Sequence, residues 1–237
     1  MLPVRTLAIL AASAPALLAS SASLAGGQAN IGLVSEYMRD GISYTAGEYA
    51  FQAGADYTHS SGLYGGIAAS EVKHQYETGH YERDLFAGWY IPLTDDIAVD
   101  AGVTRYTFQG DRYGNEKDYS ETFARALYND RLTLGWRQSA KYLGSDFAKR
   151  TVEVAYTLPL NTFGIEFYTA QHRYLEVNDD YNFGGNNRST YWHFRIAGER
   201  TYNKYDYRLS LERTNLTSEY DAGTIIQFGI HRYFDLF

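Results

Sequence analysis

The stretch Ile97-Ala-Val-Asp-Ala-Gly-Val-Thr104 alternates in polarity almost throughout its length. Apolar residues occupy the odd positions up to Val103, while polar or small residues occupy the even ones. Successive side chains of a β-strand point to opposite faces, so a period of two marks a strand. The stretch therefore predicts a strand with one apolar face and one polar face.

The same alternation recurs along most of the chain after residue 29. It is weakest in three segments, at 30–38, 63–72 and 119–128. Most segments have the length of about 9–11 residues that a tilted membrane-spanning strand needs. In all, about 12 strands are predicted by the alternation, at residues 30–38, 49–58, 63–72, 82–91, 97–108, 119–128, 131–141, 149–158, 163–174, 189–198, 205–213 and 223–234.

The connections between these segments are alternately short and long. The short ones carry turn residues and cover 59–62, 92–96, 129–130, 159–162 and 199–204. The long ones cover 39–48, 73–81, 109–118, 142–148, 175–188 and 214–222. Short periplasmic turns opposite long outside loops are typical of outer-membrane barrels. We therefore expect residues 30–237 to form one all-β domain, a transmembrane antiparallel up-and-down β-barrel in the outer membrane of a Gram-negative bacterium.

The beginning of the chain has the pattern of an export signal. Arg5 supplies a positive charge, residues 6–18 are almost wholly apolar, and Ser23-x-Ala25 fits the small-x-small rule for signal peptidase. The apolar run is too short for a membrane helix. We expect residues 1–25 to be a cleaved signal peptide, with the cut as late as residue 29 because Gly27-x-Ala29 fits the same rule.

The composition is compatible with a membrane barrel. The mean hydropathy is −0.39, but a barrel alternates lipid-facing and lumen-facing residues, so its average is polar. The 23 tyrosines favour a bilayer interface, although an aromatic-rich soluble sandwich or lipocalin-like barrel is an alternative. The absence of cysteine excludes disulfides and thiolate sites. A net charge of −7 without a basic run argues against nucleic acid as a partner.

The last predicted strand ends at Phe237. A terminal aromatic on an alternating strand resembles the signal by which the barrel-assembly machinery recognises outer-membrane proteins. Apolar residues of this strand, however, include Phe228, Ile230 and Phe234, which are separated by even numbers of positions and therefore share one face. Phe237 is in the other phase, so either the strand bulges or Phe237 points away from lipid. The alternative is a terminal Phe without a role in assembly.

The stretch from Ala29 to Ser43 resembles the opening of the TorF-type porins, a family of proteobacterial proteins. The matching residues are Asn30, the triplet Ser35-Glu36-Tyr37 and the triplet Gly41-Ile42-Ser43, whereas Asp40 stands where that family has Arg. The resemblance implies an outer-membrane, channel-like barrel of unassigned substrate. It implies no binding residues.

If the apolar positions face lipid, the alternate positions line the lumen. Charged side chains inside a barrel mark a solute path or a network of ion pairs. We expect small hydrophilic solutes to pass through, with outer-membrane lipid and lipopolysaccharide around the barrel. Pairs between the arginines and glutamates that close the lumen are the alternative. The candidate lumen residues are Asp56, Asp84, Asp100, Arg137, Glu153, Glu166, His193, Arg195, Arg208 and Glu212.

Two further functions remain open as alternatives. A lipid hydrolase of the outer membrane would need a nucleophile and a histidine at the outer rim. Candidates are His172, His74 and His80 with Ser70 or Ser145, but none stands in a Gly-x-Ser-x-Gly motif. We therefore expect no enzyme activity.

The Tyr- and Asn-rich loops also suit a non-conducting receptor or adhesion barrel. Loop carboxylates such as Asp179 and Asp180 lack a calcium-loop pattern, so we expect no metal and no cofactor.

Overall fold

A computed structural model describes residues 25–73, 80–110, 117–178, 182–183 and 188–236. Three predictions fall on residues outside these ranges. They concern most of the expected signal peptide, the terminal Phe237, and the loop residues His74, Asp179 and Asp180.

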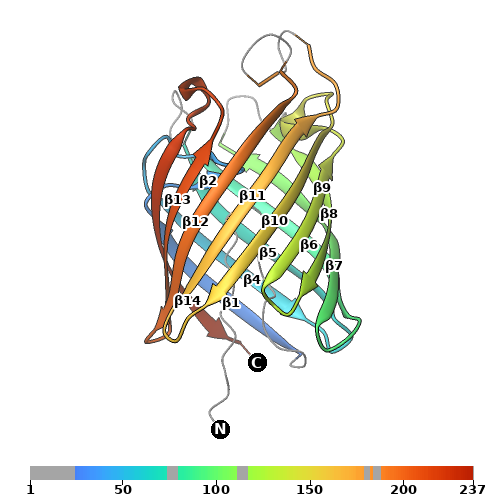
Figure 1. The fold of residues 1–237 in the computed structure, drawn as a ribbon, viewed down its shortest axis with the longest axis vertical. Coiled ribbons are helices and arrows are strands. Elements are labelled where there is room, and N and C mark those ends of the chain that lie inside the picture. Colours follow the sequence, from blue (N-terminus) through green and yellow to red (C-terminus); the bar gives the residue numbers. More distant parts are fainter. Residues whose placement is uncertain (1–24, 74–79, 111–116, 179–181, 184–187, 237) are drawn as a thin grey trace.

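Twelve long strands form a closed barrel in which each strand is antiparallel to its two neighbours (Figure 1). The barrel closes where the first strand pairs with the last, from Gln28 opposite Asp235 to Val34 opposite Gly229. The predicted fold class and strand number are confirmed. The strands are β1 (Gly26–Val34), β4 (Ala50–Thr58), β5 (Leu63–Val72), β6 (His80–Pro92), β7 (Ile97–Gln109), β8 (Tyr119–Tyr128), β9 (Leu132–Ser139), β10 (Lys149–Pro159), β11 (Gly164–Tyr174), β12 (Thr190–Tyr202), β13 (Tyr205–Thr214) and β14 (Thr224–Asp235).

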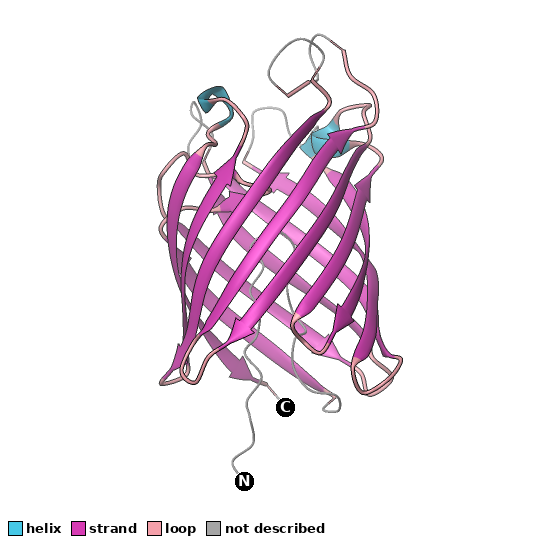
Figure 2. Ribbon diagram, viewed as in Figure 1, coloured by secondary structure: helices cyan, strands magenta, loops and turns pink. Residues whose placement is uncertain are grey.

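Four short elements among the described residues are not part of the barrel wall. The two-residue strands β2 (Met38–Arg39) and β3 (Ile42–Ser43) pair with each other. The 3-10 helices η2 (Tyr142–Gly144) and η3 (Ser218–Tyr220) lie in connections between strands. Figure 2 shows these helical turns at one end of the barrel. Among the described residues no helix is long and apolar enough to cross a membrane.

Two predicted boundaries are wrong. The first strand covers Gly26–Val34 rather than 30–38, because the chain leaves the barrel wall after Val34. The turn after β12 is shorter than 199–204, since β12 continues to Tyr202 and only Asn203 and Lys204 separate it from β13. Both turn residues have a positive φ, 52° and 68°, as a tight hairpin turn requires.

The two ends of the barrel differ as the connection lengths predict. At the turn end, the strands are joined by residues 59–62, 93–96, 129–131, 160–163 and 203–204. At the loop end, the connections are longer, with the first one running over 35–49. The start of β1 and the finish of β14 both lie at the turn end (Figure 1).

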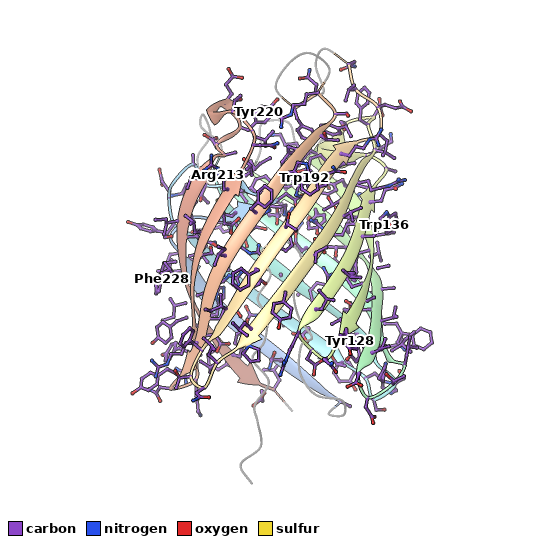
Figure 3. All side chains as sticks on the ribbon, viewed as in Figure 1. Tyr128, Trp136, Trp192, Arg213, Tyr220 and Phe228 are labelled. Carbon is purple, nitrogen blue, oxygen red and sulfur yellow. The ribbon has the colours of Figure 1, made fainter. Side chains whose placement is uncertain are left out.

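The outer surface of the barrel is apolar. Figure 3 shows Trp136, Trp192 and Phe228 on this surface, and their exposed fractions are 37%, 41% and 46%. Rings lie toward both ends of the strands, as in the aromatic girdles of membrane barrels. Phe228 and Phe234 are both exposed, which confirms the predicted phase of the last strand. The exposed rings near the ends include Tyr49, Phe51, Tyr81 and Trp192 at the loop end, and Tyr57, Trp89, Tyr128 and Tyr202 at the turn end.

Candidate functional site

All of the predicted lumen residues lie on the inner surface of the barrel. Each is buried except Asp56, which is half-buried. Their neighbours along each strand point outward and are mostly exposed. Their position therefore agrees with the alternation of the sequence, while a role in conduction stays a prediction.

The first long connection enters the lumen. Residues 35–49, which we name the inward loop, were expected as an outside loop at 39–48. Instead Met38, Arg39 and Asp40 are 0%, 2% and 1% exposed. The physical reason is charge pairing: the loop carries a cation and an anion side by side, and the barrel wall offers a partner for each.

Arg39 binds an acidic and aromatic region of the wall. Its guanidinium forms an ion pair with Glu82 and lies 3.5 Å from Asp84 Oδ2. Nη1 donates to the Tyr119 hydroxyl at 3.1 Å. The same guanidinium lies over the ring of Tyr106, 4.1 Å from its centroid, where the face of an aromatic ring attracts a cation.

Asp40 binds a basic region on the neighbouring strands β9 and β10. Its carboxylate accepts a hydrogen bond from Arg137 Nη2 at 2.7 Å and another from Lys149 Nζ. Burial by itself would raise the pKa of this carboxyl, but Arg137 and Lys149 together hold it well below its usual range. Asp40 is therefore ionised at neutral pH. Its backbone carbonyl also accepts a hydrogen bond from the Tyr191 hydroxyl at 3.1 Å.

Backbone contacts hold the inward loop along its length. Ser43 N donates to Asp221 O at 2.9 Å, and Lys73 N donates to Tyr44 O at 2.7 Å. Gly41 follows the charged pair Arg39 and Asp40 and has a φ of +77°. A Cβ at this position would approach Thr214 Cγ2 to 2.4 Å, so glycine is needed both for the backbone conformation and for space.

Tyrosine rings fill the lumen around the inward loop. Tyr106 and Tyr119 stack with centroids 4.6 Å apart, and Tyr142 meets Tyr119 edge-on at 5.1 Å. The tyrosines were interpreted as interface residues, but many lie inside, because a phenol fills volume while its hydroxyl binds a buried carboxylate or arginine. The buried tyrosines are Tyr37, Tyr44, Tyr106, Tyr119, Tyr142, Tyr168, Tyr174 and Tyr191.

A second charge cluster lies on the inner face of the adjacent strands β11, β12 and β13. Glu166 Oε1 accepts hydrogen bonds from Arg195 Nε and from Arg208 Nη2, both at 2.8 Å. Nearby, His193 Nε2 lies 2.9 Å from Glu212 Oε2. Arg137 likewise pairs with Glu153 at 3.2 Å. The expected pairing of lumen arginines with glutamates is thus present.

The lumen is more open toward the turn end. Asp100 accepts a hydrogen bond from the Tyr64 hydroxyl at 2.7 Å and pairs with Arg125 at 3.4 Å. Asp56 is half-buried, and its Oδ1 has no partner among the described residues. Tyr233 is half-buried as well. Asp56 and Tyr233 are thus less buried than the side chains around the inward loop.

The buried charges of the lumen have an acidic excess. Nine acidic side chains are buried against five basic ones, and the half-buried Arg125 does not reverse the sign. The acidic ones are Asp40, Glu82, Asp84, Asp100, Glu121, Glu153, Glu166, Glu199 and Glu212, and the basic ones are Arg39, Arg137, Lys149, Arg195 and Arg208.

The described hydrolase candidates do not form a catalytic relay. His172 is fully buried in the lumen rather than at the rim. Its Nδ1 faces both Thr151 Oγ1, at 2.9 Å, and Asp40 Oδ2, at 3.8 Å. A relay needs the nucleophile and the acid on different ring nitrogens. Ser145 Oγ donates to Tyr142 O at 2.6 Å instead.

Sequence reasoning missed the residues that contact the inward loop. Glu82 has the same strand phase as Asp84, and Lys149 begins a strand at an inward position. Arg39 and Asp40 were assigned to an outside loop. The available signal was the family resemblance, since its matching triplets lie on both sides of this charged pair.

Comparisons with known proteins agree with the barrel. The KdgM porin has 10% sequence identity and a TM-score of 0.55, over 87% of this chain and 99% of that chain. The NanC porin has 11% identity and a TM-score of 0.57, over 89% of this chain and 100% of that chain. At this identity the likeness shows a shared fold.

No curated protein matches the sequence. The family model described as "Bacterial protein of unknown function (Gcw_chp)" matches residues 19–218. This match spans most of the chain, including all but the last of the barrel strands in full. The chain therefore belongs to the Gcw_chp family of bacterial proteins of unknown function.

Proposed function

We propose that the protein is an outer-membrane channel of the porin type for small hydrophilic solutes, and that the inward loop holds it in an occluded state. The observation that carries this proposal is the pairing of Arg39 with Glu82 on β6 and of Asp40 with Arg137 on β9, two charged regions of the lumen wall. In a barrel with a purely structural interior, side chains of the strands would fill the lumen. Here Arg39 and Asp40 of a connecting loop fill part of it, and water or solutes could replace their ion pairs with the wall.

The apolar exterior supports the location of the channel. A closed barrel satisfies every backbone hydrogen bond within its wall, so it can stand in lipid. The exposed apolar side chains along the strands, among them Ile31, Leu85 and Ile196, would contact acyl chains. Lipopolysaccharide would then surround the loop end, with the turn end in the periplasm.

The acidic excess of the lumen points to cations or neutral solutes rather than anions. An excess of one sign along a narrow path raises the local concentration of the opposite ion. One similar structure is titled a KdgM porin in complex with disordered oligogalacturonate, which is an anionic saccharide. The buried carboxylates of the present lumen would repel such a solute, so we propose a different substrate class.

Several finer assignments belong to the same proposal. The opening motif around Ser35-Glu36-Tyr37 supports a place among the TorF-type porins. The start of β1 at Gly26 supports signal cleavage after Ala25, and Phe237 would assist recognition by the barrel-assembly machinery. A channel without enzyme activity of its own is part of the same proposal.

Conductance of the refolded mature protein in a planar bilayer tests the proposal. Wild-type protein should open seldom, whereas a variant lacking residues 36–48 should conduct continuously and favour K⁺ over Cl⁻ in a salt gradient. Heat-modifiable migration on a gel would verify that both proteins form barrels. A folded deletion variant that carries no current would refute the channel, and anion preference would refute the proposed solute class.

A further inference from the structure

We propose that the wall around Arg39 is a binding site for organic cations bearing a guanidinium group, and that Arg39 occupies it as an internal ligand. The site consists of Glu82 and Asp84 on β6, Tyr106 on β7 and Tyr119 on β8. This inference names a ligand class and its residues within the proposed channel. It rests on that function only in requiring that solutes reach the lumen.

The geometry is that of guanidinium recognition. Tyr106 and Tyr119 are stacked at 4.6 Å, and the guanidinium carbon of Arg39 lies 4.1 Å from the Tyr106 centroid. A planar cation over an aromatic face is stabilised when water is excluded, and these rings are 1% and 2% exposed. The carboxylate of Glu82 supplies the opposite charge, and the Tyr119 hydroxyl supplies a hydrogen-bond acceptor.

The internal ligand does not use every acceptor that the site offers. Glu82 Oε2 and Asp84 Oδ1 are buried and have no hydrogen-bond partner among the described residues. On the ligand side, Arg39 Nε also lacks a partner there. Arg39 is tethered at Met38 and Asp40 and reaches the carboxylates mainly through Nη2. A free guanidinium has no tether, so it can present two nitrogens to the two carboxylates at once.

The number of acceptors also leaves room for a cation with more than one donor group. Two carboxyl groups, those of Glu82 and Asp84, face the one guanidinium of Arg39. The nearby cations Arg137 and Lys149 are both paired with Asp40. Buried carboxyl groups are stable only when each has a cationic or hydrogen-bonding partner. A solute with both a guanidinium and an ammonium group could contact both Glu82 and Asp84.

Competition between the solute and Arg39 would couple binding to opening. Both occupy the same acceptors, so a bound solute favours the state in which Arg39, and with it the inward loop, has left the wall. The tether gives Arg39 a high effective concentration. Wild-type protein should therefore bind free guanidinium compounds weakly, and a variant without Arg39 should bind them more tightly.

Calorimetric titration of the full mature chain, refolded in detergent, tests the inference. Methylguanidinium is the probe, and methylurea is its neutral isostere. Arg39→Ala should bind methylguanidinium at least about tenfold more tightly than wild type, because the internal competitor is gone. Arg39→Ala combined with Glu82→Gln should lose that gain. Arg105→Ala, which removes an arginine that points away from the lumen, should behave as wild type.

Each result either supports the inference or overturns it. Equal affinity of wild type and folded Arg39→Ala for methylguanidinium would overturn it, as would equal binding of methylurea. If Arg39→Ala does not fold, Arg39→Gln, which keeps an unbranched polar side chain without the charge, takes its place. Binding is measured without a membrane, so a protein that binds the probe and never conducts would refute the channel alone. A channel that conducts without this binding would refute the present inference alone.

Discussion

Asp40 and Arg137 are 97 positions apart in the chain, yet Arg137 Nη2 donates a 2.7 Å hydrogen bond to Asp40 Oδ1 inside the barrel. Asp40 belongs to a loop and Arg137 to the wall strand β9. Both side chains are almost wholly buried, with exposed fractions of 1% and 2%. This pair joins the inward loop to β9, the strand next to the Arg39 site on β6 to β8, and it defines the first prediction.

Asp40→Asn should release the inward loop. The substitution keeps the shape but removes the charge that Arg137 and Lys149 share, and an unmatched buried cation costs about 3–5 kcal/mol. The docked loop should become at least about 100-fold less favoured. Trypsin cleavage after Arg39 should accelerate, and channel openings should lengthen. Asp146→Asn is the matched control, because that side chain is 87% exposed in a surface pair. Unchanged cleavage in Asp40→Asn would contradict the role of this pair.

Gly41→Ala should disturb the same loop by packing rather than by charge. Gly41 and Gly47 both have positive φ, +77° and +83°, so alanine at either costs about 1 kcal/mol in the backbone. Only at Gly41 would the new Cβ meet neighbours, Thr214 and His193, whereas Gly47 has open space. Trypsin accessibility should rise in Gly41→Ala by clearly more than in Gly47→Ala. Equal effects would show that the contact with Thr214 does not matter.

Ile196→Arg should destabilise the barrel in lipid. Ile196 lies mid-strand on the outer surface and is 51% exposed. An arginine at the bilayer midplane of a membrane barrel costs about 2–4 kcal/mol. The midpoint of urea unfolding in lipid vesicles should fall accordingly. Leu93→Arg is the control, because Leu93 is equally exposed, at 59%, but lies in a turn. An unchanged stability of Ile196→Arg would show that this side chain does not contact the acyl chains of the bilayer.

Deletion of Phe237 should lower the amount of heat-modifiable barrel in the outer-membrane fraction. Phe228 and Phe234 already face outward in the other phase, so the deletion removes no part of the described apolar surface. Its effect should therefore lie in assembly rather than in the stability of refolded protein. Phe237→Tyr, which keeps a terminal aromatic ring, should assemble normally. Normal assembly of the deletion variant would leave Phe237 without a role.

The mature protein should begin at Gly26. Gly26 and Gly27 pair with Thr58 and Tyr57 in the barrel wall. Cleavage after Ala29 would remove these ladder positions and shorten β1 to five residues, Asn30–Val34. Mass spectrometry of protein isolated from the outer membrane measures the first residue directly. A mature chain starting at Asn30 would contradict the use of Gly26 as the first strand residue.

The sequence by itself determined the barrel. A polarity period of two depends only on the order of neighbouring residues. Stretches such as Leu85 to Ile91 therefore indicate a lipid face and a lumen face without any long-range information. Turn residues such as Asn129 and Asp130 act locally too, because their side chains tolerate the positive φ that a tight turn needs. For the same reason the inward position of Arg137 and Glu166 could be predicted from phase alone.

Only the tertiary structure decided what fills the lumen. Whether the loop after Val34 turns outward or inward depends on whether Arg39 and Asp40 find opposite charges, and those charges come from β6, β9 and β10. These partners are far apart in the chain and meet only because the barrel closes, so no local sequence pattern predicts their pairing. Tyr106 and Tyr119 likewise acquire their role from the cation placed over them. The alternation of the strands determines the wall, and the long-range pairing of buried charges determines that the inward loop lies inside it.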